Sequence, residues 1–201
     1  MAAKPLQDMR VAILAATDFE QVEMVEPRKA LEDAGAKTVL VSTKVGAIDG
    51  MNHDHKGDSF EVEQALDQAD PADYDGVMLP GGALNADHMR VEPKAQEFVR
   101  HMRDAGKPMA VICHAPWLLV SAGLVRGRTL TSYHTIADDI RNAGGTWVDR
   151  ETVVDGNLLT SRKPDDIPAF NREMIALFER SRTPGQRRMS EPVSRTERIA
   201  G

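Results

Sequence analysis

The stretch AVICHAP, residues 110–116, places a cysteine and a histidine at the end of a short apolar run. The run is typical of a buried strand, and the segment after it is typical of a helix, so Cys113 and His114 occupy a strand-to-helix turn. Such a turn pushes a side chain out at the edge of a sheet. The helix that follows directs unpaired N–H groups and its positive dipole end toward that side chain.

The strand–helix unit recurs along the chain. Further strands are predicted at 9–16, 37–42, 74–82 and 128–133, and helices at 17–35, 93–106, 136–145 and 168–181. Residues 44–73 indicate a glycine-punctuated loop leading into a weak strand, and 146–162 a hairpin that turns at Asp155-Gly156. Repeated strand–helix units predict an α/β fold, with a mostly parallel sheet covered by helices on both faces.

The first helix carries two local signals. Asp18 can cap its start, with Gln21 three residues on as a capping-box partner, and Gly35 suits its end. Pro27 lies inside the segment, so we expect a kink or break near Glu26.

Composition narrows the class of protein. The net charge of −6 argues against a nucleic-acid-binding surface, and no apolar run approaches the roughly 20 residues that span a bilayer. The first residues lack the apolar stretch of a signal peptide, so a cytoplasmic protein is expected. The single cysteine excludes an intramolecular disulfide and a multi-cysteine metal site.

The chain is expected to form one domain over residues 1–182, followed by a polar, basic arm at 183–201. The arm has no apolar periodicity. It is either a solvated segment or one that packs on a partner subunit.

Cys113 has two interpretations. A helix start favours the thiolate, so its position predicts a lowered pKa and a nucleophile, with His114 as acid–base partner or oxyanion-hole donor. Gly82, in the turn Pro80-Gly81-Gly82, can bring a second backbone N–H close because it has no Cβ. The alternative is that Cys113 is a small core residue, as most free cysteines are.

Several motifs together resemble the PfpI-like branch of the ThiJ/PfpI superfamily. They are ATDFEQVE (16–23), LPGG (79–82), AVICHAPWLLVSAGLVRGRTLTSY (110–133), ADDIRNAGGTWVD (137–149), VVDGN (153–157) and TSRKPDDIPAFNREM (160–174). The resemblance implies a flavodoxin-like three-layer sandwich that needs no cofactor.

The resemblance also implies the roles of individual residues. It makes Cys113 the nucleophile beside His114, and Glu20 a protonated acid whose side chain meets the cysteine. Gly82 and His114 would donate to the oxyanion. A homodimer or higher homo-oligomer is implied, in which an acid just after the glycine turn, here Asp87, reaches His114 of the next subunit.

Other candidate residues remain weaker. Glu23 is expected to be an ordinary acid on the helix surface, while Tyr133 and His134 are candidates for lining the pocket. His53, Asp54 and His55 could bind a metal but lack a further ligand, so a solvated or subunit-contact loop and no metal are expected. No histidine follows His134, which argues against a glutamine amidotransferase of this fold.

Two functions share these residues. The first is a stress-response enzyme whose thiolate attacks carbonyl carbon, either as a hydrolase or protease or as a deglycase or glyoxalase acting on glyoxal adducts, with a small carbonyl or peptide substrate. The second is a non-catalytic sensor of oxidative stress, or a chaperone, in which the same cysteine is oxidised. A binding domain with an inert cysteine is a third interpretation.

Overall fold

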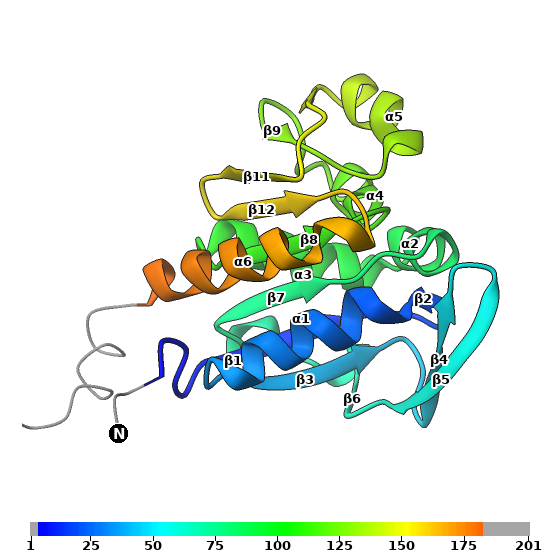
Figure 1. Cartoon of the computed structure of the whole chain (residues 1–201), viewed down its shortest axis with the longest axis vertical. Helices are drawn as coiled ribbons and strands as arrows, with labels where there is room; N and C mark the ends of the chain where they lie inside the picture. Colours follow the sequence, from blue (N-terminus) through cyan, green and yellow to red (C-terminus); the bar gives the residue numbers. More distant parts are fainter. Residues whose placement is uncertain (1–3, 183–201) are drawn as a thin grey trace, which may run out of the picture.

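A computed structural model describes residues 4–182; the predicted arm at 183–201 lies outside the described residues. The central sheet has the strand order β11-β12-β8-β7-β1-β3-β6, and all its neighbouring strands are parallel except β11 and β12 (Figure 1). Its strands are β1 (Arg10–Leu14), β3 (Lys37–Ser42), β6 (Gln64–Ala65), β7 (Gly76–Leu79), β8 (Met109–Ile112), β11 (Thr152–Asp155) and β12 (Leu158–Ser161). The predicted α/β fold is confirmed.

Helices cover both faces of this sheet. They are α1 (Gln21–Asp33), α2 (Ala83–Arg90), α3 (Pro93–Asp104), α4 (Pro116–Ser121), α5 (Ala137–Asn142) and α6 (Ile167–Ser181). Helices α1 and α6 pack together on one face, whereas α2, α3 and α5 pack against α4 on the other (Figure 1). Alternate side chains of β1 enter two separate apolar clusters, Ala12 and Leu14 in one and Val11 and Ile13 in the other. The chain therefore builds three layers with a core on each side of the sheet.

Two smaller sheets and four 3-10 turns complete the described residues. One sheet joins β2 (Phe19–Glu20), β4 (Ala47–Asn52) and β5 (His55–Glu61), and the other joins β9 (Thr129–Leu130) and β10 (Thr146–Trp147). The 3-10 turns are η1 (Leu66–Gln68), η2 (Pro71–Asp73), η3 (His134–Ile136) and η4 (Pro164–Asp166). The β4–β5 hairpin fills much of the region predicted as a loop.

The start of the first helix differs from the prediction. Phe19 and Glu20 pair with β4, so they form a strand and the helix begins at Gln21. Asp18 has a left-handed φ of 64° and does not cap the helix. No break occurs near Glu26, because α1 continues through Pro27 to Asp33.

Two turns also depart from the sequence prediction. The segment after the glycine turn at 81–82, for which no helix was predicted, forms α2. In the β11–β12 hairpin Asp155 pairs with Leu158, so the two-residue turn is Gly156-Asn157 rather than Asp155-Gly156. Across residues 4–182, none of the helices has both the length and the apolar character that crossing a bilayer requires.

Candidate active site

Cys113 stands directly after β8, at the carboxyl end of the central sheet. Its φ is 63°, a left-handed conformation that is uncommon outside glycine, and its side chain is buried. Its N–H donates to the Ser161 carbonyl at 3.1 Å, and its own carbonyl accepts from the Tyr133 N–H at 2.8 Å. Backbone on both sides therefore holds the cysteine in this strained turn, which is a feature of functional sites.

His114 lies against the thiol. Its Nδ1 is 3.1 Å from Cys113 Sγ, and its Nε2 is 3.1 Å from Thr135 Oγ1. Burial lowers the pKa of His114, and the charge on nearby His134 lowers it further. The ring is therefore neutral at neutral pH, and the tautomer that donates Nε2–H to Thr135 turns the Nδ1 lone pair toward the thiol. The sequence offered no signal for Thr135 itself, although the preceding Tyr133 and His134 were candidates for lining the pocket.

The acid that meets Cys113 is Glu23, and the prediction that assigned this role to Glu20 is wrong. Glu23 is fully buried, its Oε2 accepts the Gly81 N–H at 3.0 Å, and its carboxyl group is a hydrogen-bond partner of the Cys113 thiol. Burial first, and the neighbouring charge of Glu20 second, raise the pKa of Glu23 to about 8. Glu23 is therefore the protonated acid of the site, not an exposed residue of the helix surface.

Glu20 has a different place. Its carboxylate accepts the backbone N–H of His53 at 3.2 Å and lies 3.8 Å from the imidazole Nδ1 of the same residue. Glu20 thus fastens the β4–β5 turn to the start of α1. Its charge affects the site by raising the pKa of Glu23.

The thiol does not have the lowered pKa that the sequence suggested. Burial raises the pKa of Cys113, and the Glu23 carboxylate raises it further when ionised; the N–H groups of Gly82 and His114 act in the opposite direction. The rise in the pKa of Cys113 that burial causes is larger than the decrease that the two N–H groups cause. The resting thiol therefore keeps its proton and needs a base to remove it, and neutral His114 is in contact with it.

Glycine is required where the turn at 81–82 approaches the cysteine. A Cβ on Gly81 would lie 2.5 Å from Cys113 Cβ and 2.4 Å from Glu23 Oε2. Gly82 has a φ of 90°, and its N–H points at the sulfur together with that of His114. These two donors can stabilise negative charge on an oxygen at this place.

Asn85 on α2 braces this turn, and sequence reasoning missed it. Its amide nitrogen donates to the carbonyls of Pro80 at 3.0 Å and Gly81 at 2.8 Å, while its oxygen accepts the Ala16 N–H at 2.7 Å. Because it is 1% exposed, these bonds are shielded from water. Asn85 thereby joins the carboxyl ends of β1 and β7.

The remaining predicted residues surround the cluster. The Tyr133 ring stacks on His114 with centroids 4.7 Å apart, and the exposed His134 ring lies 4.6 Å from Tyr133. Asp87 is exposed on α2, and its contact with His114 of another subunit stays a prediction. His55 and Asp54 lie 3.5 Å apart; within residues 4–182 the side chains form no group of three or more His, Cys, Asp or Glu arranged to hold a metal.

Known proteins match most of this chain. The model of the DJ-1/PfpI family matches residues 9–177. The chain is 41% identical to "Deglycase PfpI" of Pyrococcus furiosus, over 85% of this chain and 100% of that one. It is 35% identical to "Putative cysteine protease YraA" of Bacillus subtilis, over 85% and 98%.

A solved structure agrees with the fold. Drosophila melanogaster DJ-1beta superposes with a TM-score of 0.76 at 25% identity, covering 87% of this chain and 96% of that one. The segment that the family model matches, residues 9–177, includes Cys113, His114 and Glu23. The chain belongs to the DJ-1/PfpI family.

Proposed function

We propose that the chain is a cofactor-independent, cysteine-dependent deglycase that hydrolyses glyoxal-type adducts of small amines or thiols. The observation that carries this proposal is the contact between the Cys113 thiol and the neutral His114 imidazole, whose Sγ and Nδ1 atoms are 3.1 Å apart. Two backbone N–H donors, those of Gly82 and His114, are directed at the same sulfur. Two relatives that match this chain over their own whole length are named deglycases, which supports the choice of substrate class.

Each residue of the site has a separate role in the proposed reaction. Cys113 Sγ forms a bond to the carbonyl carbon, the thiol proton passes to His114 Nδ1, and the carbonyl electron pair moves to the oxygen held by the Gly82 and His114 N–H groups. Glu23, with a pKa of about 8, supplies a second proton near neutral pH.

A hydrogen then moves from the attacked carbon to the neighbouring carbinol carbon as the protonated amine or thiol leaves that carbon, and water hydrolyses the resulting Cys113 thioester. Overall the adduct takes up one water and gives the free amine or thiol and one 2-hydroxy acid. One carbon is oxidised while its neighbour is reduced, so no external oxidant or reductant is consumed.

Product formation from a glyoxal hemithioacetal tests this proposal. The wild-type chain is expected to release thiol and glycolate, and Cys113→Ala and Cys113→Ser are expected to release neither above the uncatalysed rate. A peptide substrate assayed in parallel decides between the deglycase and the protease named among the relatives. Unchanged glycolate release by Cys113→Ala would end the proposal.

The proposal also covers the oligomeric state of the chain. We infer a homodimer or higher homo-oligomer in which Asp87 of one chain lies near His114 of another. Asp87 lies on the exposed side of α2, and the same helix turn exposes Leu84, which is 55% exposed.

A second candidate, a redox sensor, rests on the protonated Glu23. A neutral carboxylic acid beside Cys113 can donate a hydrogen bond to an oxygen added to the sulfur. Peroxide treatment followed by intact-mass measurement should add one or two oxygens at Cys113, and a mass that does not change rejects this role.

The cytoplasm is the compartment that fits both candidates. Cys113 acts as a free thiol in either one, and reducing compartments keep thiols free.

A further inference from the structure

A cavity of about 250 Å³ lies beside the active site. It is lined by Ser132, Tyr133, His134, Asp149, Arg162 and Lys163. Its volume is below the roughly 300–1,000 Å³ of drug-sized sites and suits a group the size of one amino acid. A larger cavity of about 510 Å³, between Lys44 and Glu92, contains none of the site residues.

The walls of the smaller cavity are joined to the nucleophile. Tyr133 donates its N–H to the Cys113 carbonyl, and Arg162 directly follows Ser161, which accepts the Cys113 N–H. The Tyr133 ring also stacks on His114. The cavity wall is therefore in direct contact with the backbone of Cys113 and with the ring of His114.

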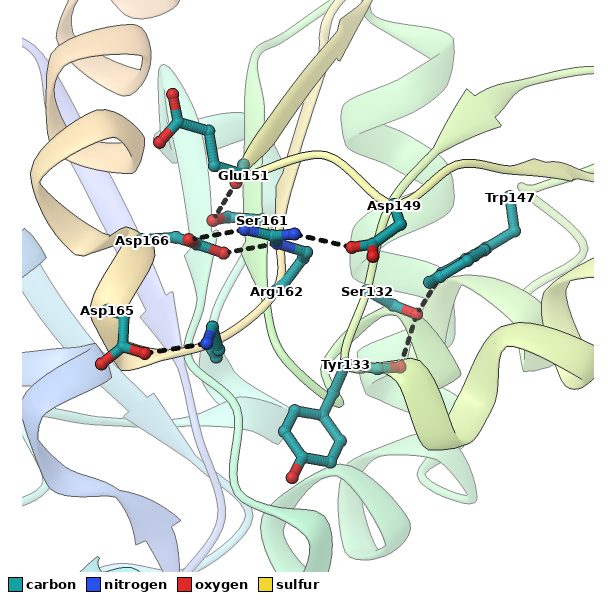
Figure 2. A network of polar contacts seen from close by, with 10 residues as sticks. Ser132, Tyr133, Trp147, Asp149, Glu151, Ser161, Arg162, Asp165 and Asp166 are labelled. Carbon is teal, nitrogen blue, oxygen red and sulfur yellow. Dashed lines mark hydrogen bonds and ion pairs between the residues drawn. The ribbon is translucent and has the colours of Figure 1, made fainter.

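Arg162 is held in a fixed orientation at this cavity. The buried carboxylate of Asp166 accepts two of its N–H groups, at 2.8 and 3.0 Å, and Asp149 accepts a third at 2.6 Å (Figure 2). Asp166 fixes the guanidinium plane, since it is itself immobilised by burial. Asp149 is 68% exposed and lines the cavity, so an incoming anion can take its place on Arg162.

The opposite wall is braced as well. Trp147 Nε1 donates to Ser132 Oγ at 3.0 Å, and Ser132 Oγ donates to the Tyr133 carbonyl at 2.8 Å (Figure 2). These bonds hold the aromatic wall and the segment that carries Asp149 in one unit. The cavity is therefore shaped before a ligand arrives.

Two of the side chains that line the cavity, Arg162 and Lys163, are cations, and one, Asp149, is an acid. Each cation also pairs with an acid outside the lining, Arg162 with Asp166 and Lys163 with Asp165. An anion can therefore bind here by replacing an exposed carboxylate and not by meeting an excess of positive charge. Lys163 pairs at 2.8 Å with Asp165, which is 79% exposed and so is also replaceable. The planar fork of an arginine matches a carboxylate better than it matches a point charge.

We propose that this cavity binds the α-carboxylate of the carrier, so that the preferred substrates are glyoxal adducts of free amino acids or of C-terminal residues. This inference rests on the proposed function and names its substrate class. The carboxylate is received by Arg162 and Lys163, and the adduct carbonyl reaches Cys113 past Tyr133.

Two matched hemithioacetals test the proposal, those of glyoxal with N-acetyl-L-cysteine and with N-acetyl-L-cysteine amide, compared at equal free glyoxal. The carriers differ only in the carboxylate. The KM of the carboxylate carrier is expected to be about tenfold lower, as a charge-assisted hydrogen bond gives. Equal KM values for the two carriers overturn the proposal.

Two substitutions should move this selectivity in opposite directions. Lys163→Gln removes a cation and should raise the KM of the carboxylate carrier, whereas Asp149→Asn removes the carboxylate that competes for Arg162 and should lower it. The amide carrier should respond to neither. Lys94→Gln is the matched control, because Lys94 is also exposed and paired, with Glu97 on α3. Equal shifts for both carriers would indicate a merely structural role and reject the proposal.

Binding to the Cys113→Ser protein separates this inference from the proposed function. If wild type turns over neither adduct, the deglycase proposal fails, but N-acetyl-L-cysteine should still shift the amide resonances of Tyr133 and Lys163 more strongly than its amide does. Equal shifts with the two probes, or shifts confined to other parts of the chain, overturn the carboxylate site itself.

Discussion

At the scale of single residues, burial decides the chemistry of Glu23 and Cys113. Both side chains leave water, so the neutral form of each is favoured, and their contact makes two negative charges at this place costly. Cys113 also holds a left-handed backbone conformation, which costs on the order of 1–3 kcal/mol and is sustained by its two backbone hydrogen bonds.

The raised pKa of Glu23 predicts a pH-dependent stability. The folded state keeps the proton up to about pH 8, whereas the unfolded chain releases it near its ordinary value of 4.5. The stabilisation is thus fully present below pH 4.5 and is lost as the pH rises through 8. Glu23→Gln cannot ionise, so its free energy of unfolding should rise relative to wild type by up to about 4 kcal/mol across this window.

Urea denaturation at several pH values measures this difference, and Glu20→Gln is the control. Glu20 is the acid beside His53, and its substitution should give a much smaller trend. A difference between Glu23→Gln and wild type that stays constant from pH 4.5 to 8 would show that Glu23 has an ordinary pKa.

The sequence identified Cys113 but not its acid, for a physical reason. The choice between Glu20 and Glu23 depends on where α1 begins. Pairing of Phe19 and Glu20 with β4 is a long-range contact that local helix signals do not contain, and it moves the helix start to Gln21. Glu23 then faces the sheet, and Glu20 faces the β4–β5 turn.

At the scale of elements, α2 and the glycine turn before it form one unit. Gly81 and Gly82 allow close approach to Cys113 and Asp18, and Asn85 on the first turn of α2 binds the carbonyls that precede it. A glycine pair directly after a proline is typical of a turn, and for this reason the helix was not predicted. Its amphipathic pattern covers only eight residues.

Asn85→Ala should therefore both destabilise the fold and damage the site. It removes the side-chain partner of the buried Ala16 N–H and of the Pro80 carbonyl, at a cost of ~2–4 kcal/mol in the free energy of unfolding. The kcat should fall more than the KM rises, since the Gly82 N–H moves. Chemical denaturation and steady-state kinetics test this, with the exposed Ala83→Ser on the same helix as control. An unchanged stability would contradict the bracing role of Asn85.

At the scale of the whole molecule, the alternation of strands and helices made the three layers predictable. Parallel strands buried on both faces are near-continuous apolar runs, as in 110–112, and they are separated by helices with glycine ends. The β2–β4–β5 sheet was not predictable in the same way, because β5 is mostly exposed and carries little apolar signal. The positions of Thr135 and Arg162 at the site could not be predicted either, because long-range packing brings these residues there.

The proposed exchange of Asp87 between subunits predicts complementation. Asp87→Asn and Cys113→Ala should each be inactive or strongly impaired alone. Coexpressed as a mixed oligomer they should regain activity, because the chain that keeps Cys113 receives an intact Asp87 from its neighbour. A mixed oligomer of confirmed composition that stays as inactive as its parents would show that Asp87 does not act across the subunit boundary.

The most direct test of the central claim is kcat/KM for a glyoxal hemithioacetal, measured with wild type, Glu23→Gln and Glu20→Gln under identical conditions. If Cys113 works with the proton on Glu23, Glu23→Gln should lose roughly 100-fold, as expected for an acid–base group, and Glu20→Gln should stay within about threefold. If instead Glu20→Gln loses as much as Glu23→Gln, or Glu23→Gln is fully active, the assignment of Glu23 as the acid of Cys113 is contradicted.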